Sequence, residues 1–348
     1  MNAPLDLRSD TVTRPTPAMR KAMYEAEVGD DVLQEDPTVN TLEREAAERL
    51  GKEAALFVPS GTFGNQLALF THCPRGSEVV LAEGSHIVQH EAGAAAIIAA
   101  VQLRTLSPAG PYPSWAEIRP RLRLEENIHF PPTGLIALEN ALSNGEVIPL
   151  DDMKTVSAGA RACGVPVHVD GARIFNAAAF LGVEAAALAA AADSVMFCLS
   201  KGLCAPVGSM LTGSREFVDR ARRKRKIMGG GMRQAGVLAA AGLVALRQMT
   251  LRVAEDHATA QRLGEACLRT GLLEVRPYPV KINMLFVRFR REHAGREGRL
   301  VEELARRGVL TYAPEEGWIR FVTHHDVSAE QVETACRMLE EAASAVVV

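Results

Sequence analysis

The chain has few residues of the kinds that mark disulfide-rich or metal-binding proteins. Its 348 residues include only six cysteines and 5% aromatic residues. No Cys-x-x-Cys pair is present, and histidine and cysteine do not cluster at zinc-ligand spacing. This excludes a disulfide scaffold and a zinc site that could be recognised from sequence. We therefore expect buried thiols in a reducing compartment, and no metal ion.

The chain also lacks a strong charge of one sign and a long hydrophobic run. The formal net charge of −3 favours neither nucleic acid nor an anionic membrane as a partner. The first 20 residues have no apolar signal core, and the most apolar helical stretch, 235–246, is shorter than the roughly 20 residues that cross a bilayer. We expect a soluble cytoplasmic protein. The basic run 220–226 is interpreted first as a solvated helix face and second as an anion site.

What the chain does have is 47% hydrophobic residues, enough for a large core. Asp36 and Pro37 have the N-cap and N1 pattern of a helix that should run through Leu50, with Gly51 at its end. Beyond it, short apolar strands alternate with helices. The predicted strands are 54–58, 78–81, 135–138, 165–169, 194–199 and 207–211. Continuous apolar strands separated by helices indicate an α/β fold with a mostly parallel sheet covered on both faces.

The pattern changes after about residue 250. A helical segment from Leu251 leads to strands near Val275, at 282–289 and at 318–322, with helices near 297–307 and after Ser328. This mixture predicts a small α+β domain. We divide the chain into an N-terminal segment 1–30 that contributes to the active site and the small domain, a large domain 31–250 and a small domain 251–348.

Polar residues follow three of the predicted strands. Ser60, Gly61 and Thr62 follow the strand that ends at Val58, Asp170 follows 165–169, and Lys201 follows 194–199. Parallel strands bring their carboxyl ends to one edge of the sheet, where ligands bind in open α/β folds. These residues can therefore converge although they are distant in sequence.

Each of these groups offers something that pyridoxal phosphate (PLP) needs. Small residues at a helix N-terminus suit a phosphate. The buried carboxylate of Asp170 would keep the pyridine nitrogen protonated, and a desolvated Lys201 would supply a nucleophilic amine. Singly, each has a plain alternative: the Ser60 segment could be an ordinary turn, Asp170 could cap a helix or pair with Arg173, and Lys201 could be a surface lysine. Together they favour the cofactor.

Longer motifs carry a resemblance to a known family. They are Arg8-Ser9-Asp10-Thr11-Val12-Thr13, Gly29-Asp30-Asp31-Val32, Glu35-Asp36-Pro37-Thr38, His168-Val169-Asp170-Gly171-Ala172-Arg173, Leu199-Ser200-Lys201-Gly202-Leu203 and Gly229-Gly230-Gly231-Met232-Arg233-Gln234. From about Leu5 to the C-terminal helix, the chain resembles the low-specificity L-threonine aldolases of PLP fold type I, the aspartate-aminotransferase fold. The resemblance implies a large domain built on a seven-stranded, mostly parallel sheet, and a small C-terminal α+β domain.

The resemblance assigns roles to the matching positions. Lys201 would hold PLP as a Schiff base, and Asp170 would pair with the ring nitrogen. Ser60, Gly61 and Thr62 would bind the phosphate, with Arg233 contributed by a neighbouring subunit. Ser9, Arg173 and Arg320 would hold the substrate carboxylate, with Arg173 as a bidentate clamp that also lies beside the cofactor. Because Arg320 belongs to the small domain, the resemblance implies a pocket between domains and a homo-oligomer, a dimer or tetramer with the active site at the dimer interface.

The histidines leave alternatives open. His86 would stack on the cofactor ring, and His86 and His129 are the candidates for the base near the substrate hydroxyl, acting directly or through water. His129 is equally well interpreted as a loop residue. His168 is interpreted as a core residue, and His324 and His325 as structural residues near a strand end. Leu33-Gln34 and His90 depart from the family pattern near the substrate side chain, and His90 could share the base role or lie at the surface.

The expected activity is retro-aldol cleavage of L-threonine, L-allo-threonine or another L-β-hydroxy-α-amino acid to glycine and an aldehyde. Another reaction on the same scaffold, β-elimination or transamination, is the first alternative. The second is a protein without catalytic activity that binds a phosphorylated metabolite through Ser60-Gly61-Thr62; it would have no need of Lys201.

Overall fold

The computed structural model describes residues 4–347. Residues 1–3 and 348, the outermost parts of the predicted segments 1–30 and 251–348, lie outside the described range. The chain divides into two compact units. The large unit comprises Pro15–Ser143 and Val147–Thr250. The small unit comprises the described residues up to Arg14, the short insertion Asn144–Glu146, and the chain from Leu251 onward.

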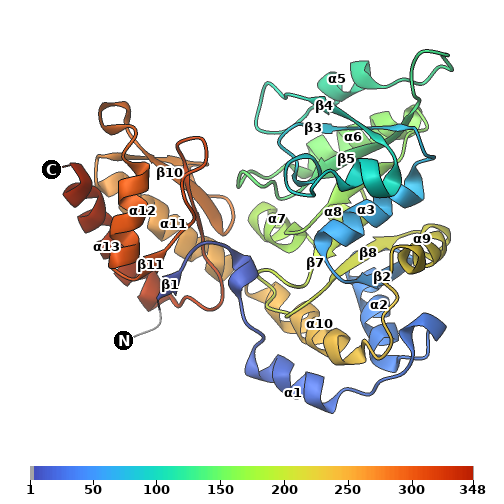
Figure 1. Cartoon of the computed structure of the whole chain (residues 1–348), viewed down its shortest axis with the longest axis horizontal. Coiled ribbons are helices and arrows are strands. Elements are labelled where there is room, and N and C mark those ends of the chain that lie inside the picture. The colour runs from blue at the N-terminus through green and yellow to red at the C-terminus, as the bar shows by residue number, and fades with distance from the viewer. Residues whose placement is uncertain (1–3, 348) are drawn as a thin grey trace. The chain divides into compact units, whose positions relative to one another are not determined.

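The large unit is built on a seven-stranded sheet in the order β2-β8-β7-β6-β5-β3-β4 (Figure 1). Only β8 runs antiparallel to its neighbours, so the other six strands point the same way. The strands are β2 (Ala54–Val58), β3 (Glu78–Ala82), β4 (Gln102–Leu106), β5 (Thr133–Glu139), β6 (Val167–Asp170), β7 (Ser194–Cys198) and β8 (Ser209–Gly213). The predicted α/β class with a mostly parallel sheet is confirmed. The sequence analysis missed β4, whose polar residues reflect its place at the sheet edge.

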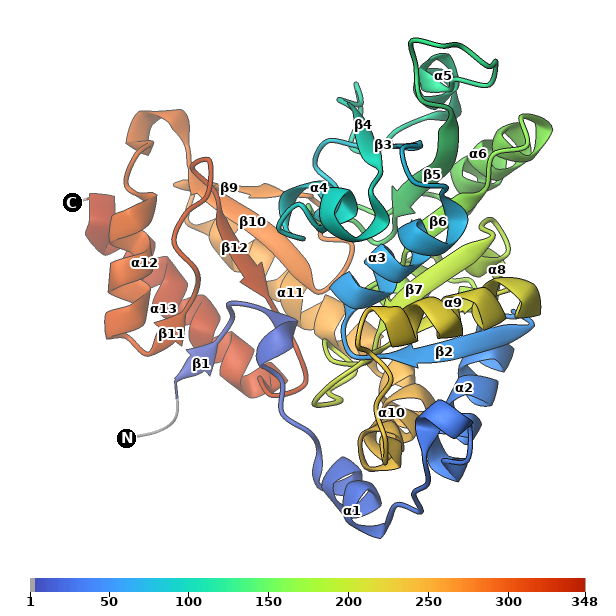
Figure 2. The ribbon, with the colours of Figure 1, turned by 45° about the vertical axis from the view of Figure 1, so that its right-hand side comes forward.

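Helices cover both faces of the sheet. At its β2 end, α3 and α9 lie on one face and α2 and α10 on the other (Figure 2). The helices of this unit are α1 (Pro17–Glu25), α2 (Pro37–Arg49), α3 (Gly61–His72), α4 (His86–Gln89), α5 (Trp115–Ile118), α6 (Leu150–Ala162), α7 (Ile174–Leu181), α8 (Ala185–Ala189), α9 (Arg215–Ile227) and α10 (Gly236–Gln248). As predicted, Asp36 caps α2: its side chain accepts hydrogen bonds from the backbone N–H groups of Thr38 and Val39.

Helix α3 packs unusually close to strand β7. A Cβ atom on Gly61 would lie 2.8 Å from Cys198 Sγ, and one on Gly64 would lie 2.6 Å from Met196 Cγ. Real Cβ atoms essentially never come this near, so glycine is required at both positions. The close packing sets the N-terminus of α3 beside the end of the strand that leads to Lys201.

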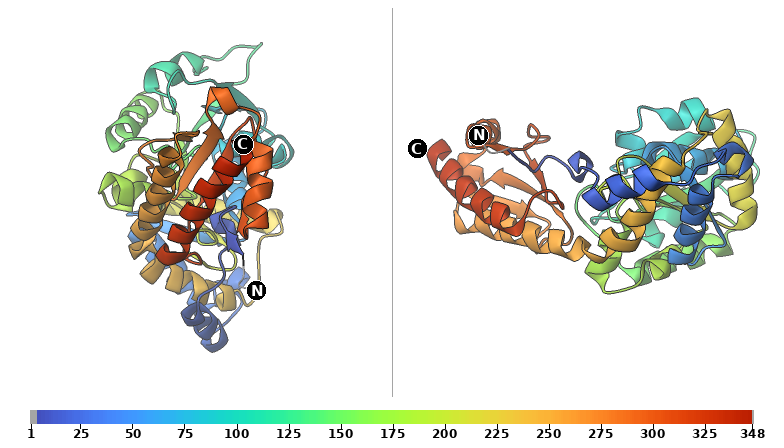
Figure 3. Two further views of the ribbon diagram at one scale, coloured as in Figure 1. Left: turned by 90° about the vertical axis from the view of Figure 1, so that its left-hand side faces the viewer. Right: turned by 90° about the horizontal axis from the view of Figure 1, so that it is seen from below.

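The small unit has its own core around two small sheets. Strands β9 (Leu273–Arg276), β10 (Met284–Phe289) and β12 (Ile319–Val322) form an antiparallel sheet in the order β12-β10-β9, and β1 (Leu5–Asp6) pairs in parallel with β11 (Val309–Leu310). Helices α11 (Val253–Arg269), α12 (Glu297–Arg306) and α13 (Ala329–Val347) pack together (Figure 3). Their buried side chains join Leu7, Phe289 and Phe321 in one hydrophobic cluster.

The interpretation of the basic run 220–226 as a solvated helix face is corrected by the structure. Arg225 is 2% exposed, ion-paired to Asp31 at 2.8 Å, and its Nη1 donates to the backbone oxygen of Phe57 at 2.8 Å. Arg222 pairs with the buried Glu43 at 2.6 Å. Because α9 packs on β2, the two arginines, nearly one helical turn apart, reach acids inside the fold. Burial raises the pKa of both Asp31 and Glu43, against the lowering by the arginines.

Four side chains of this run, those of Arg222, Arg223, Arg225 and Lys226, line a cavity of about 430 Å³ in the large unit. Its lining comprises Val32, Gln34, Asp219, Arg222, Arg223, Arg225, Lys226 and Gly231.

In the described part of the chain, no single helix is long and apolar enough to cross a membrane. Residues 236–251 and 253–269 pass that test of length and composition only when taken together as a bent pair.

Candidate active site

Three of the predicted groups lie at one edge of the central sheet. Strands β2, β6 and β7 run in the same direction, so the residues that follow their carboxyl ends share an edge. Ser60 follows β2 and caps α3, accepting a hydrogen bond from Phe63 N at 3.1 Å. The first N–H groups of a helix lack intrahelical acceptors, so the N-terminus of α3 presents donors of the kind that suit an anion.

Asp170 is the last residue of β6, and it is buried with defined donors. Its Oδ1 accepts a hydrogen bond from Ala172 N at 3.0 Å, and its Oδ2 accepts one from Asn65 Nδ2 at 2.8 Å. These bonds fix the carboxylate plane, which is what a partner for a flat heterocycle requires. Helix capping would account for the local bond from Ala172 N, but not for the bond from Asn65 on α3.

His86 is held by two acids. Its backbone N–H donates to Glu139 Oε2 at 2.8 Å, and its Nδ1 lies 2.9 Å from Glu91 Oε1. Glu91 is buried and also accepts hydrogen bonds from Asn65 Nδ2 at 2.8 Å and Gln66 Nε2 at 2.5 Å. The sequence analysis missed Glu91 and Asn65. The only available signal for Glu91 was an acid among small residues, five positions after His86.

The charges around His86 show that the candidate catalytic groups are close together. The hydrogen bond to Glu91 raises the pKa of His86, while burial lowers it. The charge of Asp170 raises this pKa further and the charge of Lys201 lowers it, so both residues act on the same imidazole. Burial, followed by the charge of Asp170, raises the pKa of Glu139. The edge of the sheet therefore gathers an amine, an imidazole and three carboxyl groups.

His86, Glu91 and Asp170 could also serve as metal ligands by distance alone. One ligand atom from each lies within 4.8 Å of the other two. The amide N–H groups of Asn65 point at both carboxylates. A cation would have to displace these hydrogen bonds, so the donor set suits hydrogen bonding better than metal binding.

The other predicted residues of the large unit lie in more open settings. Arg173 is half-buried and immediately precedes α7. His90 is exposed, with its ring centroid 5.4 Å from that of His86. His129 is exposed in the loop before β5, as its interpretation as a loop residue predicts, and Leu33 is 63% exposed. Arg233 is exposed and pairs with Asp30 of its own chain at 2.8 Å.

In the small unit, Ser9 is buried at the start of a short 3₁₀ turn, where its Oγ accepts hydrogen bonds from Thr11 N and Thr11 Oγ1. Arg320 lies on β12, with its guanidinium over the ring of Tyr312 and Nη2 3.5 Å from Arg8 O. Arg8 is therefore next to both candidates for binding the substrate carboxylate in this unit: it precedes Ser9 in the chain, and its backbone oxygen lies near Arg320.

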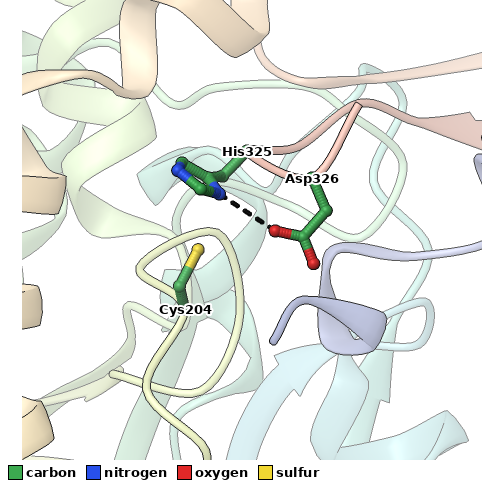
Figure 4. A group of neighbouring side chains, drawn as sticks. All are labelled: Cys204, His325 and Asp326. Atoms are coloured by element: carbon green, nitrogen blue, oxygen red, sulfur yellow. Dashed lines mark hydrogen bonds and ion pairs between the residues drawn. The ribbon is translucent and has the colours of Figure 1, made fainter. Parts of the chain in front are cut away.

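The histidine pair lies just after the end of β12, the position predicted for it. His324 is buried, and its Nε2 donates to Asp6 O at 2.8 Å. His325 Nδ1 lies 2.9 Å from Asp326 Oδ1, the dashed contact in Figure 4. Cys204, also drawn there, is a buried residue of the large unit with a left-handed backbone, φ 64°.

The fold and the sheet-edge residues define a class of protein. A model of the beta-eliminating lyase family matches residues 6–290, and the chain belongs to this family. Within it, the chain is 44% identical over 333 residues to the low specificity L-threonine aldolase of Escherichia coli K12, covering 94% of this chain and 96% of the relative. It is 43% identical to the probable low-specificity L-threonine aldolase 2 of Arabidopsis thaliana, with 97% and 96% covered. The resemblance drawn from the motifs is confirmed.

Solved structures show the same fold. A threonine aldolase from Leishmania major superposes with a TM-score of 0.84 at 18% identity, covering 98% of this chain and all of that one. Serine palmitoyltransferase from Sphingomonas wittichii gives 0.79 at 18% identity, covering 99% and 88%. The predicted fold type I architecture is confirmed by these superpositions.

Proposed function

We propose that the chain is a PLP-dependent L-threonine aldolase that cleaves L-threonine, L-allo-threonine and related L-β-hydroxy-α-amino acids to glycine and an aldehyde. The observation that carries the proposal is the 44% identity to a low specificity L-threonine aldolase along nearly the whole chain. The placement of Asp170, His86 and Lys201 at the carboxyl edge of the sheet supports it.

The residues present fit PLP. The N-terminus of α3 would bind the phosphate through Ser60, Gly61 and Thr62, and a Cβ atom on Gly61 would lie 2.8 Å from Cys198 Sγ, so a larger residue there would force a shift. Asp170, held by two donors, would face the ring nitrogen, and Lys201 would supply the amine that binds the aldehyde as a Schiff base. When bound, PLP would act as an electron sink for the charge left at Cα after the Cα–Cβ bond breaks.

The arginines and Ser9 would orient the substrate. Arg173 and Arg320 would hold the substrate carboxylate with the hydroxyl of Ser9. By fixing the carboxylate, these residues would limit rotation about the bond from Cα to the amino nitrogen and would select which bond of Cα is broken. Such orientation can contribute about 7–11 kcal/mol of barrier lowering in favourable cases.

His86 is the better supported base. Its Nδ1 faces a carboxylate, so Nδ1–H donates to Glu91 and the Nε2 lone pair is left to accept the β-hydroxyl proton, directly or through water. The same carboxylate stabilises the imidazolium that results, and His86 would stack on the ring. His129 and His90 are exposed in this chain and remain alternative bases.

Substrate preference would depend on Leu33 and His90, which replace aromatic residues of many relatives. A smaller Leu33 leaves room for larger β-substituents, and His90 offers a polar contact.

We also propose a cytoplasmic homo-oligomer, a dimer or tetramer, in which Arg233 of one subunit reaches the phosphate site of another. The exposed position of Arg233 is compatible with that role, and six free cysteines suit a reducing compartment.

The test is product analysis with L-threonine and added PLP. We expect acetaldehyde and glycine in equal amounts from the wild type, and a loss of activity below detection in Lys201→Ala. Lys154→Ala is the control, because Lys154 is an exposed residue of α6 paired only locally with Asp151. Ammonia with 2-oxobutanoate would instead assign the chain to β-elimination, the alternative that the family name favours.

A further inference from the structure

A continuous line of polar side chains, all buried except the half-buried His72, runs through the large unit behind Asp170. From α3, His72 Nε2 lies 2.8 Å from Ser194 Oγ, the first residue of β7. The same Oγ lies 2.8 Å from His168 Nδ1, on β6, and His168 Nε2 lies 3.2 Å from Asn65 Oδ1. Asn65 then reaches the carboxylate of Asp170. None of the roles proposed above uses His72, Ser194 or His168.

The chemistry of Asn65, together with a neutral His168, fixes the direction of every bond in this line. Its Nδ2 faces Glu91 Oε1 and Asp170 Oδ2, both at 2.8 Å, and only an N–H donor suits two carboxylates. Its oxygen therefore faces His168, whose Nε2 must carry the proton. Burial lowers the pKa of His168 and favours its neutral form, in which Nδ1 accepts the single hydroxyl proton of Ser194.

The same reasoning reaches the far end. Because the Ser194 proton is used, its oxygen accepts a hydrogen bond from His72 Nε2–H. Both histidines thus carry a proton on Nε2, and burial, which lowers the pKa of His168 to about 3 and that of His72 to about 4, favours the neutral form of each. All four bonds donate toward Asp170, so each polarises the next in the same sense.

We propose that Asn65 is a positioning residue, aimed by the line His72–Ser194–His168, whose one amide nitrogen fixes both the carboxylate that faces the PLP ring nitrogen and the carboxylate that orients His86. Its two N–H bonds are divided between Asp170 and Glu91, so the separation of these acids is set by a single planar group. His168, interpreted from the sequence as a core residue, has a second role as the group that prevents the amide from turning over. This inference rests on the proposed function only in its reference to PLP.

The first part of the test needs no cofactor. In the PLP-free protein labelled with ¹⁵N-histidine, we expect long-range NMR couplings to report His72 and His168 as neutral Nε2–H tautomers. A proton on Nδ1 of either ring would overturn the directed line, whatever reaction the protein catalyses.

The second part compares PLP binding in three variants by equilibrium dialysis and visible absorption. Asn65→Leu, which removes both N–H donors, should weaken PLP binding about 10- to 100-fold, the effect of losing a hydrogen bond to a charged group, and should change the pH dependence of the bound spectrum. Gln66→Leu is the matched control: it is the adjacent buried amide on α3, but it donates to Glu91 alone. Its loss of PLP affinity should be much smaller than that of Asn65→Leu, because Asp170 keeps its donor.

If Asn65→Leu does not fold, a pair at His168 replaces it. His168→Gln keeps a side-chain N–H that can face Asn65, whereas His168→Leu removes it. We expect His168→Gln to retain PLP affinity and the bound spectrum and His168→Leu to lose both in part. Equal PLP affinity and spectra in the wild type, Asn65→Leu and His168→Leu would overturn the proposal, whereas a wild type that does not bind PLP would overturn the proposed function instead.

Discussion

At the scale of single residues, the contact between Glu91 and His86 makes the clearest prediction. Removing the negative charge with Glu91→Gln should lower the pKa of His86, because the hydrogen bond to Glu91 is the largest cause that raises it. The pKa of His86 is measured by NMR titration of the PLP-free protein. Glu83→Gln is the control, since Glu83 belongs to the same part of the chain but does not act on His86.

The raised pKa of His86 also predicts how the stability of the fold changes with pH. A histidine whose pKa is higher in the folded state stabilises that state at pH values below its unfolded pKa, and this contribution is lost as pH rises through the folded pKa. The wild type should therefore gain stability over Glu91→Gln as pH falls toward 6. An unchanged His86 titration in Glu91→Gln would contradict the assigned contact.

At the scale of elements, the N-terminus of α2 depends on one side chain. Asp36 is buried and accepts N–H groups not only from Thr38 and Val39 of its own helix but also from Gly29 at 3.2 Å and Gly236 at 2.8 Å. Asp36→Ala leaves all four donors without this acceptor and should cost about 3 kcal/mol or more of unfolding free energy.

The control for Asp36 is Ser214→Ala at the N-cap of α9. Ser214 accepts a side-chain hydrogen bond from Phe217 N alone, so its loss should cost about 1 kcal/mol. Both values come from urea unfolding monitored by circular dichroism. Equal losses of unfolding free energy in the two variants would mean that the hydrogen bonds that Asp36 accepts from Gly29 and Gly236 contribute nothing to stability.

The contact of α3 with β7 gives a second prediction for an element. The methyl group added in Gly64→Ala would lie 2.6 Å from Met196 Cγ. This overpacking should destabilise the large unit by about 1–3 kcal/mol. Gly298→Ala, within α12, meets no atom within 4 Å. It should be neutral or stabilising by up to about 1 kcal/mol. Thermal unfolding of both variants decides whether α3 is as closely packed as described.

These elements also show how far sequence reasoning reaches. The cap at Asp36 and the buried strands follow local rules. The cap is found where it was predicted, whereas the strand ends are shifted by up to two residues, so that Asp170 is the last residue of β6 and does not follow it. α3 begins at Gly61 because Ser60 caps it, and its glycines allow it to approach β7. The ion pair of Arg225 with Asp31 and the bonds of Asn65 to Glu91 join residues 25 or more apart in sequence. Local sequence patterns relate residues only a few positions apart, so they do not predict contacts between residues this distant in the chain.

At the scale of the whole molecule, buried neutral histidines predict acid sensitivity. Burial lowers the pKa of His72 and His257 to about 4 and that of His168 to about 3, whereas an unfolded histidine titrates near 6.5. Below pH 6.5 the unfolded state binds protons that the folded state does not, so stability falls as the pH falls. Each histidine contributes up to about 1.4 kcal/mol per pH unit in this window.

Urea unfolding at pH 7, 6 and 5 measures this slope. His168→Gln should reduce the loss between pH 6.5 and 5 by about one histidine's share, and His129→Gln, at an exposed loop position, should leave it unchanged. A stability that is flat between pH 7 and 5 would show that these histidines are not buried in neutral form.

The measurement that tests the central claim most directly is an NMR assay of L-threonine with PLP in D₂O. Cleavage of the Cα–Cβ bond followed by protonation from solvent predicts acetaldehyde and glycine in a one-to-one ratio, with one deuterium at Cα of each glycine formed by a single turnover. Formation of 2-oxobutanoate and ammonia, or threonine left uncleaved by protein that has bound PLP, would contradict the account.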